Sequence, residues 1–354
     1  MQKSTQIGIS INDVSLNLES NHEPLLDYAK EHLGGLATAE HHEPDIAVKC
    51  HWQESPWDPE ENPFPTNGEM NKIGKRMVGK DDELIWLNTV RMKGLKLRFR
   101  RKNDRLLFDV FFSYQPRKKK GVIIPDYIFK RYFSLMSYAV YYPIFWYLEN
   151  FRNLTPVHAS GLDIMGNGVL VGGLGGIGKT TTCVALIQHG NARLISENLV
   201  FTNGEGLFPC YEPIRLNQES INILSSKVDG LRRMAFPEGL KAKSLYHIDT
   251  NSLPTNVKPK AVFLPVFSPR RYVREIDPLL AAERLQSTNQ LTRELDDYYW
   301  YASALSMTWP RNRQGALRPD ILHRLTGTTA CFELGVDRKA GVEAVVEDIL
   351  SKTM

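Results

Sequence analysis

The first part of the chain alternates apolar and polar side chains with a period of two, as half-buried strands do. IGISIND and VSLNL alternate in this way, and DIAVKCHW predicts a further short strand. GLKLRFRRKNDRLLFDVFFSY predicts a hairpin that turns at Asn103 and Asp104. SPWDPEENPFPTNG, rich in proline and acidic residues, predicts a loop. We therefore expect residues 1–153 to form a mainly β (α+β) domain.

The pattern changes near Asn153 to Pro156. It then runs strand, tight turn, strand, glycine-rich loop, helix and strand, which is how α/β phosphate-binding domains begin. Further on, KAVFLPVF and ACFELG predict strands, whereas DPLLAAERLQSTNQLTREL and GVEAVVEDILSKT predict helices. The sequence thus predicts a second domain, of the α/β class, over residues 154–354.

Tyr132 to Phe151 is the one long apolar stretch. It contains two serines and five tyrosines, so it favours a buried helix, kinked near Pro143, over a membrane span. An interfacial membrane contact is the alternative. The four cysteines form no CxxC pair and the N-terminus has no signal-peptide pattern, so we expect a cytoplasmic protein.

A basic stripe accompanies the predicted hairpin. Lys96, Arg98 and Arg100 share one face of its first strand, and the run RKKK follows at residues 117–120. This face is either a surface for phosphate or acidic partners or a solvated edge strand. The formal net charge of +4 tolerates acidic ligands without demanding nucleic acid. We interpret Asp109, on the second strand, as a polar residue of one strand face.

The segment GLGGIGKT matches the P-loop (Walker A) pattern G-x-x-x-x-G-K-[ST] completely. Glycines let backbone N–H groups turn toward phosphates, Lys179 reaches the terminal phosphates, and the Thr180 hydroxyl is suited to Mg²⁺. A strand precedes this loop and a helix follows it, ending near Gly190. We therefore expect ATP or another nucleoside triphosphate to bind here. The candidate nucleotide-binding residues are Gly173, Leu174, Gly175, Gly176, Ile177, Gly178, Lys179, Thr180 and Thr181.

Glu197 and Asn198 follow the predicted strand ARLIS. If this strand runs parallel to strand 168–172, both strands end at one sheet edge and Glu197 emerges beside the loop. The alternative is a solvent-facing loop acid. His158 belongs to TPVHASGLDI, which pairs with GVLVGG across the turn MGNG, and counting from this turn places it opposite roughly residue 174.

Together, VHASGLDI, GVLVGGLGGIGKTTTCVALIQHG and ARLISEN resemble the HPr kinase-like branch of P-loop kinases, a fold related to phosphoenolpyruvate carboxykinase. The resemblance covers residues 156 to 202 and implies a strand histidine, His158, and an acid pair after the loop helix. Glu197 and Asn198 occupy the positions of that Asp-Asp pair, which in the family deprotonates the acceptor hydroxyl and organises magnesium. The segment YEPIRLN, with Glu212 and Arg215, is a weak echo of a further family signature.

The resemblance implies a Mg²⁺-dependent kinase that transfers the γ-phosphoryl group of ATP to a serine-like hydroxyl on a peptide, protein or small molecule. Catalytic candidates are Glu197, His158 and Lys179, and metal candidates are Thr180, Glu197 and Asn198. Basic candidates for holding phosphate or acceptor are Arg215, Lys241, Lys243, Arg270 and Arg271.

The sequence is also compatible with two other functions. The first is a catalytically weakened nucleotide sensor that engages a partner, or less favourably nucleic acid, through a basic N-terminal domain. The second is a P-loop hydrolase, for which the sequence lacks an obvious Walker B acid. Homo-oligomerisation is also left open.

Overall fold

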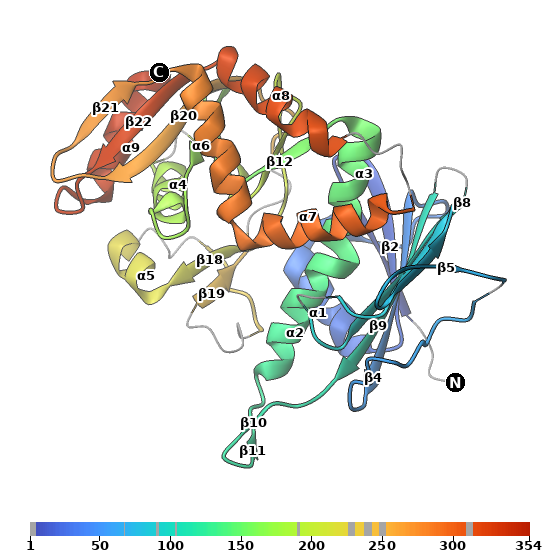
Figure 1. Ribbon diagram of the computed structural model, residues 1–354. Helices are drawn as coiled ribbons and strands as arrows, with labels where there is room; N and C mark the ends of the chain where they lie inside the picture. Colours follow the sequence, from blue (N-terminus) through green and yellow to red (C-terminus); the bar gives the residue numbers. More distant parts are fainter. Residues whose placement is uncertain are drawn as a thin grey trace. The chain divides into compact units, whose positions relative to one another are not determined.

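The computed structural model has a mixed α/β fold with several sheets (Figure 1). It describes residues 5–66, 68–89, 92–102, 105–189, 192–225, 231–236, 243–247, 253–308 and 314–354. The chain divides into two compact units. The first contains residues 1–148 and the described parts of 235–241 and 297–312, and the second contains the rest. Two segments from late in the chain thus join the first unit.

A nine-stranded sheet forms the centre of the first unit, in the order β3-β1-β2-β4-β9-β8-β7-β6-β5. Its strands are β1 (Thr5–Ile11), β2 (Val14–Ser20), β3 (Ala37–Thr38), β4 (Ile46–Glu54), β5 (Asn71–Gly74), β6 (Met77–Lys80), β7 (Glu83–Trp86), β8 (Leu95–Lys102) and β9 (Arg105–Tyr114). Strands β1, β2 and β4 and the antiparallel hairpin β8–β9 confirm the strands expected from alternation. The expected turn residues of that hairpin, Asn103 and Asp104, lie outside the described residues.

The apolar stretch before residue 152 is helical and buried, as expected. Helix α1 (Glu23–Leu33) and the short η1 (Gly34–Leu36) precede it, and the stretch itself forms α2 (Tyr127–Met136), the π-helical η2 (Ser137–Tyr141) and α3 (Tyr142–Arg152). Pro143 has no N–H to donate to the preceding turn, so the widened π turn lies directly before it. Within the described residues, no helix is long and apolar enough to cross a membrane.

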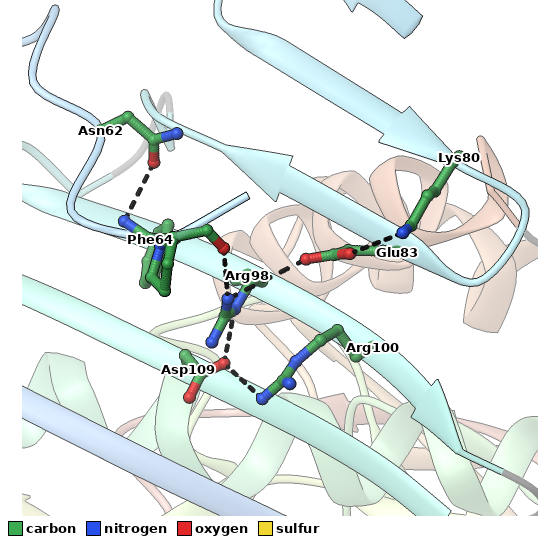
Figure 2. A network of polar contacts seen from close by, with 8 residues as sticks. Asn62, Phe64, Lys80, Glu83, Arg98, Arg100 and Asp109 are labelled. Atoms are coloured by element: carbon green, nitrogen blue, oxygen red, sulfur yellow. Dashed lines mark hydrogen bonds and ion pairs between the residues drawn. The ribbon is translucent and has the colours of Figure 1, made fainter. Parts of the chain in front are cut away.

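The basic stripe on β8 is paired throughout, and Lys96 and Arg98 are largely covered. Lys96 is fully buried, and its ammonium donates to the Glu61 carbonyl at 2.6 Å and lies 3.2 Å from the Glu61 carboxylate. Figure 2 shows that Arg98 and Arg100 both donate to one oxygen of Asp109, at 2.7 and 3.0 Å. Both interpretations of an open basic face are therefore wrong for Lys96 and Arg98, whereas the Arg100 side chain is paired but 37% exposed.

The position of β8 in the sheet explains this pairing. The strand lies between β9 and β7, so it is not an edge strand. Arg98 is directly opposite Asp109 in the register, which makes Asp109 the polar partner of a cross-strand pair. From the loop over this face, the ring of Phe64 lies 5.6 Å from the Arg98 guanidinium, and Pro65 accepts a bond of 2.9 Å from it (Figure 2). The separate hairpin β10 (Lys118–Lys119) and β11 (Val122–Ile123) remains exposed.

A six-stranded sheet, in the order β15-β13-β14-β20-β22-β21, forms the centre of the second unit. Its strands are β13 (Ala159–Ile164), β14 (Asn167–Gly172), β15 (Ala192–Ser196), β20 (Pro259–Phe267), β21 (Tyr272–Glu275) and β22 (Ala330–Val336). Strands β14, β20 and β22 are parallel neighbours, and β13–β14 is the expected hairpin. Met165 and Gly166, with φ values of 51° and 89°, make its two-residue turn.

Two small sheets complete the second unit. One contains β12 (Thr155–Val157), β16 (Val200–Thr202) and β17 (Leu207–Phe208), and the other contains β18 (Ile214–Asn217) and β19 (Lys243–Tyr246). The segment TPVHASGLDI therefore forms two strands in different sheets rather than one. The break between them falls at His158.

Helices cover both faces of the six-stranded sheet. Helices α4 (Lys179–Gln188) and α9 (Gly341–Thr353), with α5 (Gln218–Leu224), pack on one face through Val184, Ile349 and Leu224. Helices α6 (Pro278–Leu291) and α8 (Gln314–Gly327) pack on the other through Leu285 and Leu325. The helical segment after residue 277 is interrupted by the extended Thr292, and α7 (Arg293–Ser306) follows.

Candidate functional site

The glycine-rich loop joins the carboxyl end of β14 to the first residue of α4. Gly173, Gly176 and Gly178 have φ values of 120°, 86° and 95°, a region that side chains disfavour. No atom outside the loop lies within 4 Å of a Cβ built on Gly175, Gly176 or Gly178. The loop backbone is therefore open on this side, and Gly178 is the N-cap residue directly before the helix. Backbone N–H groups at a helix N-terminus of this kind favour anions.

Lys179 folds back over the start of this loop. Its ammonium donates to the carbonyl oxygens of Gly173 and Leu174, at 2.7 and 3.1 Å. Burial lowers the pKa of Lys179 to about 8, although the carboxylates of Glu197 and Glu294 act in the opposite direction. The side chain thus provides a positive charge at neutral pH within the loop.

Glu197 lies directly beyond β15, at the same sheet edge as the loop. Strand β13 is antiparallel to both β14 and β15, so β14 and β15 run in the same direction with β13 between them. The Thr180 hydroxyl donates to the Glu197 carboxylate, and Ser160 donates to the Glu197 carbonyl oxygen at 2.6 Å. Glu197 is only 5% exposed. The alternative of a solvent-facing loop acid is therefore wrong.

His158 lies at the loop end of the β13–β14 hairpin. The last pair of the register joins Ala159 and Gly172, so His158 is one residue beyond it, as the count from the turn predicts. Asn289 on α6 fixes its backbone, accepting from the His158 N–H at 2.8 Å and donating to the Pro156 carbonyl at 3.3 Å.

The imidazole of His158 is held in its neutral form. Burial, and then the positive charge of Lys179, lower its pKa to about 3, although Glu294 and a hydrogen bond with the Asn198 backbone act in the opposite direction. Its Nδ1 atom is buried and has no hydrogen-bond partner among the described residues. The ring therefore offers an unused polar atom close to the loop lysine.

Asn198, Glu212, Arg215 and Glu294 form a partly buried polar cluster next to these groups: Asn198 is 5% exposed, whereas the side chains of Arg215 and Glu294 are 20% and 39% exposed. Asn198 donates to the Glu212 carboxylate at 2.7 Å, and Arg215 lies 3.2 Å from the Glu294 carboxylate. Burial raises the pKa of Glu212 to about 7, although Arg215 and the Asn198 bond oppose this. Burial alone would raise the pKa of Glu294, but Arg215, a backbone hydrogen bond and His158 together outweigh it, and the net direction is downward.

Arg215, a candidate from the sequence, therefore contacts the site. Glu294 is a further member of this cluster that was not among the residues predicted from the sequence. Glu294 belongs to the first turn of α7 and lies 79 residues after Arg215 in the chain. No sequence motif identifies Glu294. Its position depends on where α7 begins, and that is set by the extended residue Thr292 between α6 and α7. The segment containing Glu212 and Arg215 was the one available signal for this cluster.

The remaining predicted residues are more dispersed. Thr181 is buried and donates to the Ser220 hydroxyl at 3.2 Å, whereas Leu174 is 50% exposed at the loop tip. Lys243 begins β19 and is exposed, and Arg270 is exposed after β20. Arg271 pairs with Asp348 and Glu347 of α9, and Lys241 lies outside the described residues. For these basic residues, a role in binding phosphate or acceptor stays a prediction.

Comparisons with known proteins do not assign the chain to a family. No protein-family model matches the chain, and no curated protein matches it. Among solved structures, the chain is similar to the HPr(Ser) kinase/phosphatase from Coxiella burnetii, at 17% sequence identity and a TM-score of 0.21. The match covers 34% of this chain and 78% of that chain. The resemblance of residues 156 to 202 to the HPr kinase-like branch thus stays a prediction from the sequence.

Proposed function

We propose that the protein is a kinase that transfers the γ-phosphoryl group of ATP to a hydroxyl on a peptide, protein or small molecule. One observation carries the proposal: an open glycine loop, a buried lysine and a buried carboxylate meet at one edge of the second unit's central sheet. In this account residues 154–354 contain the nucleotide-binding domain, and residues 1–153, with the late segment 297–308 that joins the first unit, recognise the acceptor.

The loop and Lys179 are suited to holding triphosphate. Loop amides at the start of α4 offer hydrogen-bond donors without side chains in the way. The Lys179 ammonium now bonds to the carbonyl oxygens of Gly173 and Leu174. Moving it to a phosphate oxygen would replace two neutral acceptors with a charged one. Its charge would then stabilise the transferring phosphoryl group.

The oxygen donors beside the loop fit a magnesium ion. Mg²⁺ takes oxygen ligands and is held by few protein groups together with substrate phosphates. The Thr180 hydroxyl and the Glu197 carboxylate are already in contact, and Asn198 is adjacent in the chain. The described residues hold no cluster of three or more His, Cys, Asp or Glu side chains for a metal. Bound magnesium would neutralise phosphate charge.

Glu197 is the proposed proton acceptor. Its position is fixed from two sides, by Thr180 at the carboxylate and by Ser160 at the backbone carbonyl. A carboxylate held in this way can accept the proton of an attacking hydroxyl. The neutral His158 ring has its unused Nδ1 atom available to accept a further hydrogen bond near the site.

Labelled ATP tests this proposal. The wild type, Lys179→Ala and the exposed-lysine control Lys339→Ala are incubated with γ-labelled ATP and host extract, and labelled species are identified. We expect label on an acceptor with the wild type and Lys339→Ala, and none with Lys179→Ala. ATP affinity measured by calorimetry should fall only in Lys179→Ala. Equal labelling by all three proteins would contradict the proposal.

A nucleotide sensor is the second candidate, and the residues after β15 favour it. A single acid, Glu197, is followed by Asn198, whose amide is bonded to Glu212. The protein would then bind ATP without acceptor-dependent turnover. Of the basic residues singled out in the sequence, those of the exposed hairpin β10–β11 are the ones suited to such a contact, because Lys96, Arg98 and Arg100 are paired internally. Label that remains only as bound ATP would favour the sensor.

A further inference from the structure

A cleft of about 500 Å³ opens within the first unit, between the β5–β6 turn, the end of β7 and helix α7. Its volume is in the range of ligand pockets, which run from about 300 to 1,000 Å³. Its apolar lining comes from Ile73, Met77, Trp86, Trp300, Ala304 and Met307. All of the lining residues belong to the first unit, including those of α7, and they are distinct from the glycine loop and the proposed catalytic residues.

The cleft exists because α7 covers the sheet only in part. Leu84 and Trp86 share a strand face, and Tyr301 and Leu305 of α7 lie with Leu84 around a small internal cavity. Leu84 is 2% exposed, whereas Trp300 and Met307 are 50% and 58% exposed. Tryptophan and methionine offer large, adaptable contact areas, and together at a surface they are typical of binding sites.

The charge around the cleft is positive. Lys75 and Arg76 line it, and no aspartate or glutamate is among the described residues of its lining. Arg76 is bonded to Glu60 at 2.7 Å, so the unbalanced charge of the lining comes from Lys75. Lys72, an exposed residue of β5 outside the lining, adds a second lysine along the neighbouring sheet edge. An occupant with acidic groups beside an apolar group would match this arrangement.

The neighbouring sheet edge suggests the shape of the occupant. Among the strands that the structure describes, β5 is the last of its sheet and has β6 as its one neighbour. An extended peptide can add to such an edge by main-chain hydrogen bonds while a pocket takes one of its side chains.

We propose that this cleft and the edge of β5 bind an extended peptide segment with a bulky apolar side chain in the cleft and acidic residues beside Lys72 and Lys75. The inference rests on the proposed function only for its purpose, which is recognition of the acceptor. The binding itself needs neither nucleotide nor the glycine loop.

Fluorescence anisotropy with labelled synthetic peptides tests the binding without nucleotide. The probe is Gly-Asp-Ile-Phe-Ile-Glu-Asp-Gly. One comparison peptide carries lysine in place of each acid, and another carries alanine in place of Ile and Phe. We expect the acidic apolar probe to bind at least about tenfold more tightly than either comparison peptide. Equal binding of the three peptides, or no binding of the probe, would overturn the proposal.

Two variants and two matched controls locate the binding. Trp300→Ala and Lys75→Glu should each weaken probe binding by roughly tenfold. Ile123→Ala and Lys118→Glu change an exposed apolar residue and an exposed lysine of the hairpin β10–β11, and should leave binding unchanged. Circular dichroism confirms that each variant folds. Wild-type affinity in Trp300→Ala contradicts the cleft as the site.

One more variant separates this proposal from the kinase proposal. Lys179→Ala should retain full peptide binding, because the lysine belongs to the other unit. Intact peptide binding with no phosphate transfer by the wild type would contradict only the kinase, whereas transfer without peptide binding would contradict only the cleft.

Discussion

The Thr180 hydroxyl donates a hydrogen bond to the carboxylate of Glu197, and this contact joins the first turn of α4 to the end of β15. The two residues are 17 positions apart in the chain. Their contact brings a hydroxyl suited to magnesium and a carboxylate suited to proton transfer to one place beside the glycine loop. The kinase proposal depends on this relationship more than on any single residue.

Glycine replacements should separate backbone strain from loss of space. Gly178 has a φ of 95° and open surroundings, so Gly178→Ala should cost about 1–2 kcal/mol through strain alone and weaken ATP binding. Gly175 has equally open surroundings but does not have a positive φ. Gly175→Ala should therefore change the free energy of unfolding by less than about 0.5 kcal/mol. Denaturant titration of both variants gives the comparison, and equal losses would contradict the strain account.

Burial of neutral His158 should make stability fall in mild acid. The unfolded histidine takes up a proton below about pH 6.5, but the folded ring resists protonation until about pH 3. Protonation thus favours the unfolded state, and stability is lost as pH falls between these values. His158→Gln should lack this loss, which amounts to as much as about 2 kcal/mol between pH 6.5 and 5.

The measurement compares unfolding free energies of wild type and His158→Gln across that pH range, without nucleotide or metal. Taking the difference between the two proteins removes the contribution of Glu212, whose raised pKa of about 7 acts in the opposite sense. Parallel pH profiles for the two proteins would show that the ring is not buried in its neutral form.

Asp109 should be important for the stability of the first unit. It is the shared acceptor of Arg98 and Arg100, and its side chain is 16% exposed (Figure 2). Asp109→Asn would leave both guanidinium groups without a charged partner there and should destabilise by about 1–3 kcal/mol.

A matched control for that change is the exposed pair Arg338–Glu219, in which both side chains are more than 60% exposed. Glu219→Gln should cost less than about 1 kcal/mol, because solvent screens such pairs. Thermal unfolding of both variants tests the difference. A loss for Glu219→Gln as large as that for Asp109→Asn would be evidence against the cross-strand network.

Local patterns predicted the elements that carry their own signal. Alternation predicted β1, β2 and β4, and the turn pattern MGNG predicted the β13–β14 hairpin with its register. The register then located His158 next to the loop, and the direction of β15 brought Glu197 to the same edge. These inferences succeeded because sequence-adjacent strands pair and because strand direction follows from short connections.

Contacts between residues far apart in the chain could not be predicted from local sequence patterns. Lys96 reads as a surface cation, but the loop carrying Glu61 covers it, and the neighbouring Arg98 meets Asp109 across the hairpin. Glu294 lies at the site because α7 begins there, after the interruption that separates it from α6. Nothing in the sequence around Glu294 indicates Arg215 as its partner. The late segment 297–308 belongs to the first unit through contacts with residues that are distant in the chain. A single sequence provides no signal for such contacts.

Glu197→Gln tests the central claim most directly. The change keeps the size of the side chain and one oxygen that can accept from Thr180, but it replaces the carboxylate that accepts the proton with an amide. ATP affinity, measured by calorimetry, should stay within about threefold of the wild type, while transfer of γ-label to the acceptor found in host extract should fall by about a hundredfold or more. Full transfer activity in Glu197→Gln, with ATP binding unchanged, would contradict the assignment of Glu197 as the base.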